Sequence, residues 1–111
     1  MMNLMEINGY KAVINYDPEI EMFRGEFIDI NGGADFYAGD IDGLRKEGET
    51  SLNVFLDMCK EDGVDPRKTF SGKFNLRISP ELHAQIVTRA TAEGKSLNKW
   101  VADLLNDTVN A

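Results

Sequence analysis

The chain has 111 residues, of which 42% are hydrophobic and 28% charged, and its formal net charge is −7 at pH 7. This composition is typical of a soluble globular protein, and the length is short for two full domains, although each half can form a small unit that leans on a neighbour or a second copy. The first residues lack a basic region and an apolar run of signal-peptide length, and no stretch is long enough to span a membrane. We therefore expect a cytoplasmic protein.

The first third of the chain predicts antiparallel strands joined by turns. Residues 10–16 place Tyr10, Ala12, Ile14 and Tyr16 on one face of a strand. Turn chemistry follows at residues 17–19, Asp-Pro-Glu. Residues 21–30 then form a second expected strand, closed by Asn-Gly-Gly at 31–33, and residues 34–38 form a third.

A helix is expected next. Asp40 can cap its N-terminus, and an apolar face is formed by Ile41, Leu44, Leu52, Phe55 and Cys59. Gly48 interrupts this pattern where a bulkier apolar residue would be expected. Glycine costs about 1 kcal/mol relative to alanine inside a helix, so we expect the helix to bend there or to begin only near Glu49. Cys59 is the single cysteine, which permits no internal disulfide and leaves it without a partner for a metal site.

Charge is divided unevenly along the chain. Residues 1–70 contain 15 acidic and 7 basic residues, a net charge of −8, whereas residues 71–111 contain 4 acidic and 5 basic residues, a net charge of +1. The acidic part would repel nucleic acid and attract a basic protein, and the second part is compatible with a phosphate backbone. We expect one domain at residues 1–65, a linker at 66–70 and a second domain at 71–111.

The second part opens with an alternating segment at residues 73–79. Lys73, Asn75 and Arg77 point to one side, and Phe74, Leu76 and Ile78 point to the other, the period of a half-buried strand. Lysine, asparagine and arginine suit base edges in a DNA major groove, which admits a two-stranded β-ribbon. A lone strand leaves its ladder groups unpaired, and the antiparallel copy in a symmetric dimer would pair them.

Two helices are predicted after this segment. Ser79 is the expected N-cap of the first, followed by Pro80 and an acid, and its apolar stripe consists of Leu82, Ile86, Val87 and Ala90. Gly94 can end this helix in the left-handed conformation. Ser96 is the expected N-cap of the second helix, whose buried face would contain Leu97, Trp100, Val101, Leu104 and Leu105.

Residues 71–109 resemble a ribbon-helix-helix DNA-binding domain, whose paired strands read the major groove. The resemblance implies base contacts from Lys73, Asn75 and Arg77, and phosphate contacts at the start of the second helix from Lys95, Ser96, Leu97 and Lys99. It also implies a homodimer core containing Phe74, Leu76, Ile78, Trp100 and Leu104. The alternative is a solvated strand face beside an ordinary pair of helices.

Nearly the whole chain resembles the HicB antitoxin family. The similarity lies in the end of the first strand at 16–17, the strand at 23–27, the start of the helix at 37–40 and the run at 71–77. It implies an α+β fold with a partial RNase H-like first domain of three or more strands and a helix. That domain would bind and block a small HicA-like, mRNA-cleaving toxin, through residues that the resemblance does not identify. The second domain would bind operator DNA and repress the operon as a homodimer or a tetramer.

Two other functions remain open. A nuclease of the RNase H type would use several carboxylates around divalent metal ions, but most acids here read as turn formers and helix caps, and His83 is the single histidine. We therefore expect neither an enzyme nor a metal or cofactor. The second possibility is a free-standing repressor whose first domain binds a small ligand or another protein.

Overall fold

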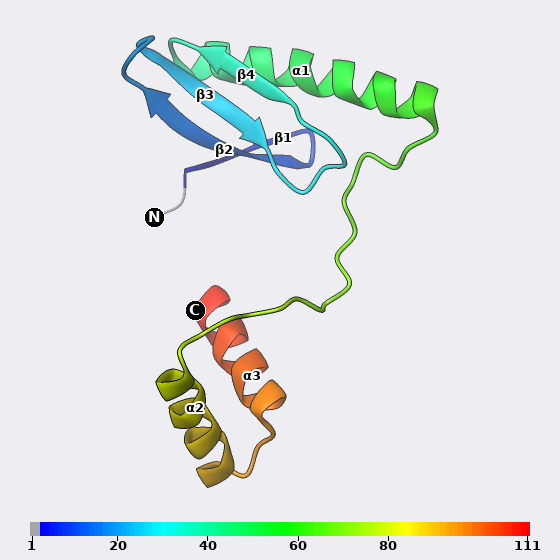
Figure 1. The fold of residues 1–111 in the computed structure, drawn as a ribbon. Helices are drawn as coiled ribbons and strands as arrows, with labels where there is room; N and C mark the ends of the chain where they lie inside the picture. Colours follow the sequence, from blue (N-terminus) through cyan, green and yellow to red (C-terminus); the bar gives the residue numbers. More distant parts are fainter. Residues whose placement is uncertain (1–2) are drawn as a thin grey trace. The chain divides into compact units, whose positions relative to one another are not determined.

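The computed structural model describes residues 3–111, which divide into two compact units (Figure 1). The first, here called the sheet unit, ends at Ser71, and the second, here called the helical unit, comprises Gly72–Ala111. Together they confirm the α+β class, with four strands in the first unit and three helices along the chain. None of the helices in the described residues is long and apolar enough to cross a membrane.

The sheet unit is an antiparallel meander covered by one helix. Strands β1 (Leu4–Ile7), β2 (Tyr10–Asp17), β3 (Met22–Phe27) and β4 (Asp35–Ala38) lie in sequence order, and α1 (Ile41–Asp62) packs on one face of the sheet (Figure 1). The strand expected at residues 10–16 is thus β2, and it is preceded by β1. The strand expected to reach residue 30 ends at Phe27 instead.

The core lies between the sheet and α1. Alternation along the strands turns Ile7, Ala12, Phe27 and Phe36 inward, where they meet Leu44, Leu52, Phe55 and Cys59 of the helix. The Phe27 and Phe36 rings lie 5.1 Å apart between centroids. Tyr16 shares the predicted face but is 55% exposed, and it makes an edge contact with Phe23 near the end of the sheet.

Helix α1 begins as predicted and runs through Gly48 without a break. The Asp40 Oδ1 atom accepts a hydrogen bond from the Gly43 amide at 2.6 Å, and the helix ends at Gly63 in the left-handed conformation. The alternative expectation, a helix that begins only near Glu49, is wrong, because α1 begins at Ile41. Gly48 is buried, and a Cβ atom there would overlap the Ile7 side chain and approach the Phe36 ring to 3.0 Å. Glycine therefore allows α1 to pack closely on the sheet.

The chain after α1 returns to the sheet unit before leaving it. Asn31 Nδ2 donates hydrogen bonds to the carbonyl oxygens of Asp65 and Arg67 at 2.8 and 3.1 Å, and its backbone amide bonds to Pro66. The Arg67 guanidinium lies over the Tyr10 ring at 3.9 Å, and the Lys68 amide bonds to the backbone of Asp29. The first residues of the expected linker are consequently attached to the sheet unit.

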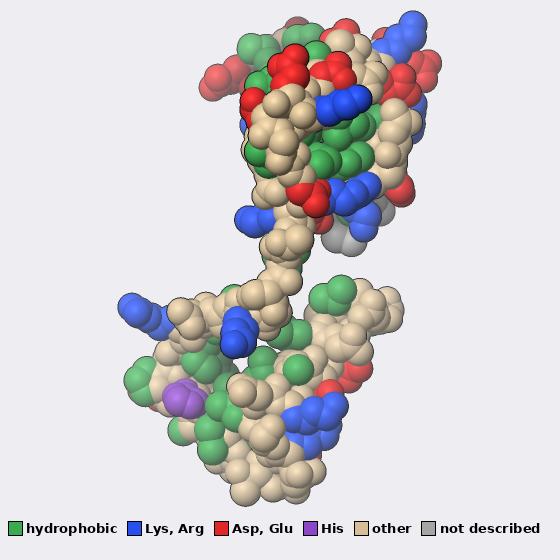
Figure 2. Space-filling model, turned by 90° about the vertical axis from the view of Figure 1, so that its right-hand side faces the viewer, with side chains coloured by type: hydrophobic (Ala, Val, Ile, Leu, Met, Phe, Trp, Pro, Cys, Tyr) green, Lys and Arg blue, Asp and Glu red, His purple; other side chains and the backbone are tan. Residues whose placement is uncertain are grey.

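The helical unit contains α2 (Pro80–Ala92) and α3 (Leu97–Val109), joined by a turn in which Gly94 has φ +71°. Both predicted N-caps are confirmed: Ser79 and Ser96 each accept a hydrogen bond from the amide three residues later, at 3.1 Å. Ala90 is the one buried hydrophobic residue of this unit. Hydrophobic side chains consequently appear at its surface (Figure 2).

The strand expected at residues 73–79 is not formed. Residues 73–78 belong to no regular element, and the sheet of the described residues consists of β1 to β4. A strand is defined by its ladder partner, so sequence alternation alone does not produce one in a single chain.

Candidate functional site

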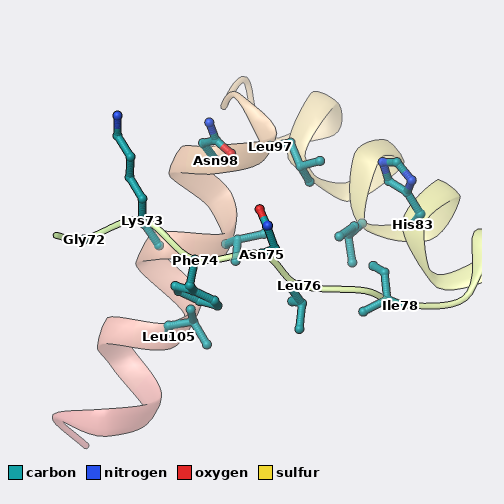
Figure 3. Close-up of a pocket in the computed structure, with 13 residues that line it drawn as sticks. Gly72, Lys73, Phe74, Asn75, Leu76, Ile78, His83, Leu97, Asn98 and Leu105 are labelled. Carbon is teal, nitrogen blue, oxygen red and sulfur yellow. The ribbon is translucent and has the colours of Figure 1, made fainter. Parts of the chain in front are cut away.

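The helical unit carries an open, largely apolar groove of about 800 Å³ (Figure 3). The segment 72–78 forms one wall of the groove, and α2 and α3 supply the rest. The apolar lining consists of Phe74, Leu76, Ile78, Ile86, Leu97, Val101, Ala102 and Leu105, and the polar lining of Lys73, Asn75, His83 and Asn98. A groove of this size in a 40-residue unit means that the unit has no closed core of its own.

The segment 73–78 is extended, and its side chains alternate. In Figure 3, Lys73 and Asn75 point to one side of the chain, and Phe74 and Leu76 point to the other. Phe74 is nevertheless 72% exposed and Leu76 66% exposed. Apolar side chains on this wall therefore reach over the groove without filling it.

Two of the predicted dimer-core residues lie elsewhere. Trp100 is half-buried, and its indole nitrogen donates a 2.5 Å hydrogen bond to the Glu93 carboxylate. Leu104 is 49% exposed. Neither lines the groove, whereas Leu97, Val101 and Leu105, which the helical periodicity had already placed on one face of α3, do line it.

The predicted phosphate-contacting residues gather at the start of α3. Lys95 and Ser96 precede the helix, and Leu97 and Lys99 lie in its first turn, where backbone amides have no partner within the helix and the helix dipole favours an anion. Ser96 satisfies one of these amides by capping Lys99. The arrangement is chemically suited to a phosphate group.

Asp103 forms ion pairs with both lysines at the start of α3, Lys95 and Lys99. Its carboxylate lies 2.8 Å from Lys99 Nζ and 3.0 Å from Lys95 Nζ. Hydrogen bonds from Lys99 and Lys95 lower the pKa of Asp103, and the hydrogen bond to Asp103 raises the pKa of Lys95. Asp103 was not among the residues predicted from the sequence, although its i,i+4 spacing from Lys99 favours such a pair.

The described residues contain no group of three or more histidine, cysteine or acidic side chains placed to hold a metal ion.

A model of the HicB family matches residues 55–105, a little under half of the chain. The match runs from the second half of α1 through α2 into α3, so the chain is similar to that family over these residues. No curated protein and no solved structure matches the chain significantly.

Proposed function

We propose that this HicB-like chain is the antitoxin of a type II toxin–antitoxin system, in which the helical unit binds operator DNA and the sheet unit neutralises a HicA-like, mRNA-cleaving toxin. The observation that carries the proposal is the open groove beside the alternating segment 73–78, in a region that lies within the family match. The sheet unit would be the partial RNase H-like domain of this family, acting without catalysis, metal or cofactor.

The partner proposed for the groove is a second copy of the chain. Two copies of residues 73–78, paired antiparallel, would satisfy each other's backbone groups and lay Phe74 and Leu76 over apolar surface on both subunits. The result is a ribbon-helix-helix homodimer with self-complementary contacts.

The paired ribbon would present Lys73, Asn75 and Arg77 to the major groove of an inverted repeat. Phosphate contacts at the start of α3 would fix the register of each subunit on the duplex, and the base contacts would supply specificity.

Variants of these residues distinguish the two kinds of contact. Arg77→Ala should lose about 1–3 kcal/mol per contact and relax the preference at one position of each half-site. Lys99→Ala should weaken binding to all sequences alike and reduce the salt dependence. Gel shifts on operator and scrambled duplexes measure both. Unchanged operator affinity in the double variant Asn75→Ala, Arg77→Ala would rule out readout by the ribbon.

Neutralisation of a toxin needs only that its active site or RNA path be covered. The net charge of −8 on residues 1–70 should speed encounter with a basic partner and should make the association rate fall with ionic strength.

Co-expression tests the antitoxin assignment. The adjacent gene product, if it is a HicA-like toxin, should arrest growth alone and should be neutralised by the full chain. The double variant Asn75→Ala, Arg77→Ala should still restore growth while failing to repress the promoter. If the full chain represses the promoter but neither binds the adjacent gene product nor restores growth, the protein is a free-standing repressor and not an antitoxin. That alternative is favoured by one observation, since strands β1 to β4 lie outside the family match.

A further inference from the structure

The sheet unit carries a second groove, of about 490 Å³, between α1 and the loop that joins β3 to β4. Ala34, Phe55 and Cys59 are buried at its floor. Val54, Met58 and Val64 line it with exposed fractions of 56%, 56% and 45%. Three large apolar side chains grouped at one opening form an apolar surface that a single chain leaves in water.

The two sides of α1 differ in charge. The Arg45 guanidinium donates to the Glu6 carbonyl on β1, whereas the Ser51 hydroxyl donates to the Asp35 carbonyl on β4, so these residues mark opposite sides of the helix. Ser51 lines the groove together with Val54 and Met58.

At 100° per residue, Glu47 and Asp62 fall on the groove side of α1 and Glu61 falls at its border. The three basic residues of the helix, Arg45, Lys46 and Lys60, fall outside this face. Among the described residues, Glu47, Glu61 and Asp62 form no ion pair. Asp62 lines the groove together with Asp35, which is already bound to Arg24 at 2.6 Å. The apolar opening is therefore bordered by acidic side chains without counter-charges.

We propose that this groove is the docking site for the basic protein partner of the sheet unit. An apolar side chain of the partner would sit against Val54 and Met58, and its lysine or arginine side chains would lie against Glu47 and Asp62. A second copy of this acidic unit would be repelled at the same place, as would nucleic acid. The inference rests on the proposed toxin-binding function and locates it on the molecule.

Met58→Glu in the full-length chain tests the apolar contact, with Ile20→Glu as its matched control. Both residues are about equally exposed, at 56% and 51%, both changes add one negative charge, and Ile20 lies in the turn after β2, away from the groove. The probe is a purified, basic HicA-like protein, taken from the adjacent gene if that gene encodes one. We expect Met58→Glu to weaken its binding about tenfold or more, and Ile20→Glu to change it less than about threefold.

Asp62→Lys tests the charge. It should slow association with the probe and flatten the dependence of the rate on salt. The circular dichroism spectrum and urea midpoint of the sheet unit should stay unchanged in all three variants, which shows that this unit is folded. If the wild-type chain does not bind the probe, the proposed function fails and the docking site with it. If the wild type binds the probe and Met58→Glu binds it as tightly as Ile20→Glu does, the groove is not the docking site, while the proposed antitoxin function stands.

Discussion

Asp103 forms ion pairs with Lys95 and Lys99, the two lysines proposed to contact DNA phosphate, and it would compete with that phosphate. Asp103→Asn should raise affinity for any duplex roughly three- to tenfold at low salt, because Lys95 and Lys99 are released and a negative charge is removed. Specificity should not improve, since the contacts are to the backbone. Asp57→Asn, which makes the same change of net charge in the sheet unit, is the control in fluorescence anisotropy titrations. Equal gains from both variants would show that net charge alone is responsible.

The same carboxylate predicts a pH dependence. The folded-state pKa of Asp103 lies below its ordinary value, chiefly because of the hydrogen bonds from Lys99 and Lys95. A lowered folded pKa contributes stability above the unfolded pKa, and this contribution is lost as pH falls through the folded pKa. In an NMR titration the Asp103 midpoint should move up toward the ordinary value when Lys99 is replaced by alanine. A midpoint that does not move would place the lysine too far away in solution.

Replacing a glycine inside a helix with alanine usually stabilises the helix, but at Gly48 we expect the opposite. Gly48→Ala should lower the free energy of unfolding of the sheet unit by about 1–3 kcal/mol, because the new methyl group overlaps Ile7 and crowds Phe36 in a packed core. Asn53→Ala, at an exposed position of the same helix, should have little effect or stabilise slightly. Urea unfolding followed by circular dichroism measures both. A higher free energy of unfolding for Gly48→Ala would mean that Ile7 and Phe36 can shift to accommodate the methyl group at little cost.

At the scale of elements, Asn31 ties the end of the sheet unit to the loop between β3 and β4. Asn31→Ala removes two side-chain hydrogen bonds and should cost about 1 kcal/mol. Amide exchange should quicken most at Lys68, which bonds to the backbone of Asp29 in the same loop. Asn53→Ala serves again as the control. Unchanged exchange at Lys68 would show that the Arg67 contacts alone hold the segment.

Elements specified by local chemistry were predicted well from the sequence. The caps at Asp40, Ser79 and Ser96 depend on residues three positions away and were all confirmed. The role of Gly48 was not predictable, because it depends on Ile7 and Phe36, which are distant in sequence.

Strand prediction from the sequence was incomplete at two places, β1 and the segment 73–78. Strand β1 has only four residues and was missed as a separate element. The segment 73–78 has the alternation of a strand but is assigned to none, because a strand also needs the ladder of a neighbouring strand. Of the candidate site, the helix faces and the start of α3 were predictable, whereas the ion pairs of Asp103 and the acidic border of the α1 groove became apparent only in three dimensions.

At the scale of the whole molecule, the two units should unfold differently with concentration. The sheet unit has its own core, whereas the helical unit buries Ala90 alone and should gain its stability by association. Trp100 is the single tryptophan, so its fluorescence reports on the helical unit. We expect the melting temperature of the helical unit, followed by fluorescence, to rise as the protein concentration is raised roughly a hundredfold. The melting temperature of the sheet unit, followed by circular dichroism of β structure, should stay constant. A fluorescence transition independent of concentration would argue for a stable monomer and against the dimer.

The sparse core of the helical unit also affects how repression would respond to protein level in the cell. If folding and pairing are one step, the amount of active repressor varies with the square of the free chain at low abundance, so promoter occupancy rises over a narrow range of expression. Unpaired chains would meanwhile offer residues 72–111 to proteases, because an unfolded backbone is cleaved readily. Dilution by cell growth would then shorten the lifetime of the protein as well as its concentration, and the promoter would reopen abruptly.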